Sequence, residues 1–242
     1  MLNNATTTNN VFKLNLEYIK TSDIKKELKM SYIEYVNYLL QKYGSAKYDY
    51  FRTPSCSSRN PNISRTDEGL FCHHIDEDKA ILLSNPEIAR NYPFEYQKAN
   101  RLVYCDIVEH LILHIKIAEE REICFSDIGI GGTSLITENI NKYISNPYSS
   151  NWEKTVIKVL EQKYNEYIYV LGYLRNLLTT DVYYAYNPLF SDCFLCFDGK
   201  NFVKSVYNDL KTMLDWDNYK DIIKNYNWSN KELNNKFNII NI

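Results

Sequence analysis

The chain has 242 residues, of which 45% are hydrophobic and 24% charged, with only 7 glycines and 6 prolines. This composition is that of a folded globular protein and excludes a low-complexity or fibrous chain. The formal net charge of −2 argues against a protein that coats nucleic acid over its whole surface, although it leaves room for a local basic face.

The sequence also lacks the signals of a membrane or secreted protein. No apolar run approaches the ~20 residues that cross a bilayer, and the first residues lack the basic start and apolar core of a signal peptide. Six cysteines at irregular spacing do not form a disulfide framework in a chain of this length. We therefore expect a cytoplasmic protein with reduced thiols and no membrane partner.

The N-terminal third predicts one helix and one long loop. Residues 1–20 are expected to be poorly ordered and then extended, and Ser31 is expected to cap a helix that ends at Gly44. Residues 45–68 are rich in Ser, Pro, Asn and Arg and therefore predict a loop. This loop is basic and could bind phosphates. Asp49 is set against four cations in this part of the sequence: Lys47, Arg52, Arg59 and Arg65.

The middle of the chain predicts two strands and a helix. Residues 69–76 and 100–105 have the composition of short strands, and one or two short helices, broken at Pro86 and Pro93, are expected between them. Asp106 then opens a helix as its N-cap, and Glu109 completes a pattern like a capping box.

The remainder predicts mostly helix. The glycine-rich residues 126–136 lack the spacing of a phosphate-binding loop, so a tight turn is the preferred interpretation. Residues 151–178 predict a long amphipathic helix, and residues 202–216 a shorter one. The single Cys-x-x-Cys pair, Cys193 and Cys196, is a weak zinc signal, and ordinary buried thiols are the favoured interpretation.

All four histidines of the chain fall within 42 residues. His110 and His114, four apart on the predicted helix, share one helix face. His73 and His74, adjacent on the predicted strand, point to opposite faces and therefore take different roles. His114 is equally compatible with an ordinary core position between two apolar neighbours.

Residues 69–79 (GLFCHHIDEDK) and 99–117 (ANRLVYCDIVEHLILHIKI) resemble the HNH, or His-Me finger, endonucleases, whose ββα-metal motif joins two strands and a helix. The resemblance covers about a fifth of the chain. It implies that His73 and His110 bind a divalent metal and that His74 is the general base. It also implies a supporting role for His114, as a third ligand or a phosphate contact.

One position departs from the pattern of this family. The family's middle Asn directly precedes the Leu-Val of the second strand, where this chain has Arg101, with Asn100 one residue earlier. Either Asn100 serves in the site through a local shift, or another bond holds the loop. Arg101 also joins Arg52, Arg59 and Arg65 as a candidate DNA contact.

The expected chemistry is hydrolysis of a phosphodiester bond. A neutral imidazole can deprotonate water near pH 7, and a metal ion can relieve charge on the phosphoryl and leaving oxygens. The family implies Mg²⁺ or Mn²⁺, whereas imidazole ligands favour Mn²⁺, Ni²⁺ or Zn²⁺. Asp76 and Asp78 could add a carboxylate, although solvated loop acids are the favoured interpretation.

These observations predict an α+β fold that is mostly helical with an embedded ββα-metal (HNH) finger. Residues 1–68 would form a helical region and basic loop, 69–120 the finger, and 121–242 a helical region for recognition or dimerisation, all packed as one globular unit. The expected function is a DNA endonuclease of the restriction, phage or mobile-element kind, with DNA as partner and a homodimer as a further expectation.

Two other functions stay open. A catalytically degenerate finger that only binds nucleic acid is one, and Arg101 in place of Asn is the best evidence for it. The other is acyl transfer, because residues 73–78 satisfy an HHxxxD pattern. That pattern normally continues with Gly, where this chain has Lys79, and it leaves His110 and His114 unexplained.

Overall fold

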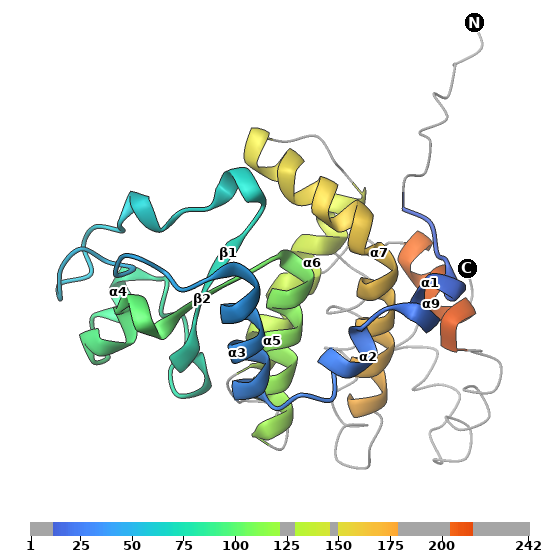
Figure 1. The fold of residues 1–242 in the computed structure, drawn as a ribbon, viewed down its shortest axis with the longest axis horizontal. Coiled ribbons are helices and arrows are strands. Elements are labelled where there is room, and N and C mark those ends of the chain that lie inside the picture. The colour runs from blue at the N-terminus through green and yellow to red at the C-terminus, as the bar shows by residue number, and fades with distance from the viewer. Residues whose placement is uncertain (1–11, 122–128, 146–149, 179–203, 215–242) are drawn as a thin grey trace, which may run out of the picture.

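The computed structural model describes residues 12–121, 129–145, 150–178 and 204–214 (Figure 1). Within them the fold is α+β and mostly helical, with one two-stranded antiparallel sheet. The predicted fold class is therefore confirmed at this level. The α-helices and strands are α1 (Leu16–Thr21), α2 (Ile24–Glu27), α3 (Tyr32–Tyr43), β1 (Phe71–His74), α4 (Pro86–Ala89), β2 (Leu102–Cys105), α5 (Ile107–Glu120), α6 (Ile130–Ser145), α7 (Asn151–Leu178) and α9 (Lys204–Leu214).

The caps read from the sequence are present in the structure. Ser31 begins α3 in a full capping box with Glu34, and Gly44 ends it at φ 78°. Asp106 begins α5 in a second capping box, with Glu109. The expectation of an extended chain up to residue 20 is wrong, because the Asn15 side chain accepts backbone N–H bonds and caps α1.

The two strands separate two cores. Val103 and Cys105 of β2 belong to a large core shared with the helices, whereas Leu102 and Tyr104 belong to a smaller core beneath the loop of residues 45–70. His73 pairs with Val103 and His74 with Leu102. The alternation of strand side chains therefore sends His73 toward the helices and His74 toward the loop.

Helix α5 is the centre of the molecule. It packs against α3, α6 and α7, and it follows β2 after a single residue, Asp106 (Figure 1). Eleven of its fourteen residues are buried, and Leu111, Leu113 and Ile115 are fully so. A helix that is apolar on nearly every side is held by its neighbours on all of them.

A buried ion cluster ties α7 to the start of α5. Lys163 lies 2.5 Å from an Asp106 oxygen and 3.0 Å from a Glu109 oxygen, and Lys42 of α3 lies 2.5 Å from the same Glu109 oxygen. Both carboxylates are almost fully buried, so each needs its cation.

In the described part of the glycine-rich stretch, residues 130–136 are helical and do not form the predicted tight turn. Gly129 has φ +105°, and Gly131 and Gly132 lie in the first turn of α6. A Cβ at Gly132 would lie 2.2 Å from Nδ1 of His114, so only glycine lets α6 approach α5 at this point.

The prolines also differ from expectation, because they begin helices instead of breaking them. Pro86 is at the start of α4, and Pro93 is the N-cap of a 3₁₀ helix, Phe94–Gln97. No described helix is long and apolar enough to cross a membrane. Cys193 and Cys196 lie outside the described residues, as does part of the helix predicted over 202–216.

Candidate metal centre

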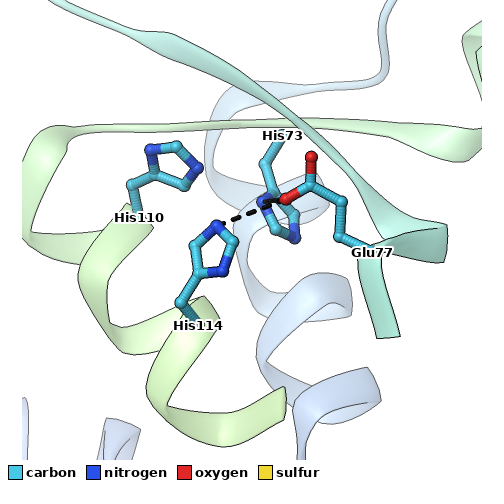
Figure 2. A group of neighbouring side chains, drawn as sticks. All are labelled: His73, Glu77, His110 and His114. Carbon is cyan, nitrogen blue, oxygen red and sulfur yellow. Dashed lines mark ion pairs between the residues drawn. The ribbon is translucent and has the colours of Figure 1, made fainter. Parts of the chain in front are cut away.

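Three of the four histidines converge with a carboxylate. His73, Glu77, His110 and His114 each place one ligand atom within 4.8 Å of all the others (Figure 2). The three histidines are among those predicted from the sequence, whereas Glu77 was not predicted, since the expectation fell on the neighbouring acids Asp76 and Asp78. Three imidazole nitrogens and one carboxylate oxygen are a common donor set for a divalent transition metal.

Three elements position these ligands. His73 lies on β1, His110 and His114 lie one turn apart on α5, and Glu77 lies in the 3₁₀ helix Ile75–Asp78 directly after β1. This tight turn folds Glu77 back beneath the strand, so that its Oε2 lies 3.5 Å from Nδ1 of His73 and 3.3 Å from Nε2 of His114. The four-residue spacing between His73 and Glu77 was the sequence signal for this pairing. The chain passes from strand to 3₁₀ helix between these two residues, so neither the strand period nor the helix period reveals it.

The tautomer of His73 follows from one tyrosine. The Tyr32 hydroxyl donates to the carbonyl of Ile75 at 2.8 Å, and its oxygen lies 2.9 Å from Nε2 of His73. Because a hydroxyl has a single proton, Tyr32 must accept from His73, so Nε2 carries the hydrogen and Nδ1 a lone pair. This Nδ1 is buried and has no hydrogen-bond partner among the described residues, so its lone pair fits the role of a metal ligand.

Electrostatics favour the neutral form of His73 and His110. Burial lowers the pKa of His73 well below its usual range, and burial together with the nearby His114 lowers the pKa of His110 to about 3. Burial alone would raise the pKa of Glu77, but the His114 hydrogen bond and the neighbouring histidines outweigh it and lower that pKa. Near neutral pH His73 and His110 therefore offer lone pairs and Glu77 a negative charge, as a cation requires.

His74 lies on the other side of β1. Its Nε2 is 2.9 Å from Oε1 of Gln97, whose amide nitrogen donates to the carbonyl of Leu83 at 3.2 Å. The amide orientation makes Nε2 the protonated nitrogen of His74, so its Nδ1 holds a lone pair 3.8 Å from Glu77. Burial lowers the pKa of His74, which keeps this lone pair available near neutral pH. Sequence reasoning did not identify Gln97.

The loop after β1 is braced by an ion pair. The Arg101 guanidinium donates to both carboxylate oxygens of Asp76, at 2.6 and 2.5 Å, and Lys79 lies 2.8 Å from the same carboxylate. The sequence left two explanations open for how this loop is held: Asn100, or a bond from another residue. The pairing of Arg101 with Asp76 is a candidate for that bond, whereas Asn100 is exposed. Asp76 is committed to Arg101 and does not face the metal ligands.

Comparison with known protein families, with curated proteins and with solved structures gives no match to this chain. The geometry of the centre therefore carries the functional argument, and the HNH resemblance stays a sequence-based prediction.

The three arginines of the basic loop have different surroundings. Arg65 is held by both oxygens of Glu68 and by the carbonyl of Tyr43, so its charge is largely neutralised. Arg59 is exposed and lies 4.8 Å from the centre of the Tyr50 ring. Arg52 is exposed on the same loop. Their contact with DNA stays a prediction.

Proposed function

We propose that the protein is a metal-dependent endonuclease that hydrolyses DNA phosphodiester bonds. The observation that carries this proposal is the convergence of His73, Glu77, His110 and His114 from β1, the turn after it and α5. Strand, strand and helix in this order are also what the sequence resemblance implies. A divalent cation bound there would supply Lewis-acid stabilisation of the phosphoryl and leaving oxygens.

The donor set bears on which metal supports activity. Zinc prefers four ligands in a tetrahedron, and four protein ligands would leave it no open position for a substrate. Mn²⁺, Ni²⁺ and Mg²⁺ accept about six ligands, so the same four residues would leave room for water and a phosphate oxygen. We therefore expect Zn²⁺ to bind tightly and to support less cleavage than Mn²⁺ or Ni²⁺.

In this proposal the chain's own residues divide the remaining work. His74 accepts a proton at Nδ1 from the attacking water, and Gln97 holds the ring in the tautomer that makes this possible. His74 is 1% exposed, so neighbouring side chains must move for this water to reach it. Arg101 and Asp76 keep the turn that carries Glu77 in place.

Cleavage of plasmid DNA tests the proposal. Protein stripped of metal by a chelator and then loaded with Mn²⁺, Ni²⁺, Mg²⁺ or Zn²⁺ should nick or cut the plasmid with at least one of them. His74→Ala should lower the rate by about 10²–10⁴-fold, the usual contribution of a general base, while DNA binding is retained. Loss of binding instead of cleavage in this variant would contradict the role of His74.

The brace offers a matched pair of variants. Arg101→Met should lower cleavage more than Asn100→Ala, because Arg101 holds Asp76 while Asn100 is exposed. The reverse order would assign the bracing role to Asn100.

The other two functions predict different results. A degenerate finger would bind DNA without cutting it with any of the metals. Acyl transfer would require binding of acetyl-CoA without bound metal, and it gives no reason for His110 and His114 to meet His73.

A further inference from the structure

A pocket of about 310 Å³ lies beside the candidate metal centre. His110 is the metal-ligand candidate that forms part of its wall, and it is more exposed than the nearly buried His73 and His114. A ligand in this pocket therefore lies next to the centre. The other wall residues that matter below are Tyr50, Arg59, Arg65, Phe71 and Trp152.

The pocket carries an unneutralised positive charge. Arg65 is paired with Glu68, but no carboxylate pairs with Arg59 in the part of the chain that the structure describes. Arg59 instead lies over the Tyr50 ring, which orients the guanidinium without neutralising it. An arginine in this state is a donor for phosphate oxygens.

The same pocket has an aromatic wall. The rings of Phe71 and Trp152 lie 5.1 Å apart in an edge-to-face arrangement, and Phe71 also packs on His110 at 5.6 Å. Trp152 is half-buried at the start of α7, so part of its ring is open to the pocket. Base-stacking sites in proteins that bind single strands combine such rings with basic side chains.

The size of the pocket limits what can enter. Its volume is at the small end of the range for small-molecule sites, about 300–1,000 Å³. One nucleotide unit suits this size, whereas the stacked, paired bases of a duplex do not. Enzymes meet this limit by acting on single strands or by extruding a nucleotide from the duplex.

We propose that this pocket receives one nucleotide unit of the DNA strand, with its phosphate at Arg59 beside His110 and its base against Phe71 and Trp152. The inference rests on the proposed function, because it takes the strand bound at the metal centre to be DNA. It adds that the preferred substrate has an unpaired or extruded nucleotide next to the scissile phosphate.

Calorimetric titration of the metal-free, full-length protein tests the pocket without requiring cleavage. The probes are thymidine 3′,5′-bisphosphate, which has a base, and inorganic pyrophosphate, which has none, at equal ionic strength. Trp152→Leu should weaken bisphosphate binding by about tenfold or more and leave pyrophosphate binding unchanged. Arg59→Ala should weaken the binding of both probes.

Arg90→Ala is the matched control, because Arg90 is an exposed arginine at the end of α4 and does not line the pocket. It should leave both affinities unchanged, and circular dichroism should show that all three variants are folded. Equal affinity for the two probes, together with no effect of Trp152→Leu, would overturn the nucleotide pocket.

Cleavage of oligonucleotides separates this inference from the proposed function. Duplexes of one sequence, with and without a central unpaired nucleotide, are compared with the metal that supports activity, and the bulged duplex should be cut at least tenfold faster. Equal rates would overturn the inference and leave the nuclease proposal standing. Nucleotide binding as expected, but no cleavage with any metal, would overturn the nuclease proposal instead.

Discussion

At the scale of single residues, the readiness of the centre for a metal depends on groups that are not ligands. The hydroxyl of Tyr32 decides which nitrogen of His73 has a lone pair, and the amide of Gln97 does the same for His74. Each imidazole is therefore oriented by a neighbour whose own hydrogen bond to a backbone carbonyl is already made. Such outer partners tune metal affinity almost as strongly as the ligands themselves do.

We predict that Tyr32→Phe weakens metal binding by about 10- to 100-fold. The variant keeps the ring but removes the acceptor for Nε2 of His73, so the proton is no longer held away from Nδ1. The dissociation constant for Mn²⁺ or Zn²⁺, measured by competition with a chromophoric chelator, reports the effect.

Tyr38→Phe is the control for this prediction. Tyr38 lies on the same helix, and its hydroxyl bonds to Glu27 at 3.3 Å, away from the centre. Equal metal affinity in the two variants would show that the Tyr32 hydroxyl does not orient His73.

At the scale of elements, the centre depends on how closely the helices approach one another. The turn Ile75–Asp78 brings Glu77 to β1, and α6 packs on α5 where Gly132 meets His114. Gly132 is not itself a ligand candidate, yet it limits where the ring of His114 can lie.

Two adjacent glycines of α6 give a paired test. A Cβ at Gly132 would lie 2.2 Å from Nδ1 of His114, whereas a Cβ at Gly131 would meet nothing within 4 Å. Gly132→Ala should displace His114 and weaken metal binding at least tenfold. Gly131→Ala should leave metal binding unchanged and stabilise the protein slightly, since Ala is favoured over Gly in a helix by up to about 1 kcal/mol. Similar metal affinities in both variants would mean that α6 does not position His114.

The buried ion cluster predicts a large effect on stability. Lys163→Met leaves Asp106 and Glu109 buried with fewer cations, so the free energy of unfolding should fall by about 3 kcal/mol. Lys158→Met, at an exposed position of the same helix, should change it by less than about 0.5 kcal/mol. Urea denaturation measures both, and equal losses would contradict the role of the cluster in joining α7 to α5.

At the scale of the whole molecule, the candidate centre lies where the sheet and the central helix meet. Its ligands come from β1, from the turn after it and from α5, and α3 supplies Tyr32. A metal bound there links elements from two regions of the chain, about 35 residues apart, and should stabilise the fold as a unit.

We therefore predict that metal raises the free energy of unfolding. An ion that binds only the folded protein should add about 2.7 kcal/mol at a free concentration 100 times its dissociation constant. Urea denaturation with Zn²⁺ or with a chelator measures this difference. Glu77→Gln should reduce the gain, because it removes the charged ligand. A variant that gains as much as the natural protein would remove Glu77 from the ligand set.

Much of the secondary structure could be predicted from local patterns in the sequence. The caps at Ser31 and Asp106, the helix over 151–178 and the opposite facing of His73 and His74 all depend on neighbours in the chain, so periodicity and capping chemistry were sufficient. One wrong expectation has a tertiary cause. The glycines of α6 were taken for a turn because their reason for being there, the ring of His114, lies on another helix.

The sequence by itself determined that one strand and one helix carry the four histidines, and that these histidines are candidates for a metal centre. Only the tertiary structure decided that Glu77, and not Asp76 or Asp78, faces His73 and His114, because a single 3₁₀ turn sets the direction of each acid. It likewise decided that Arg101 pairs with Asp76 while Arg59 keeps its charge beside a pocket. Pairing between distant residues depends on packing, which no local pattern specifies.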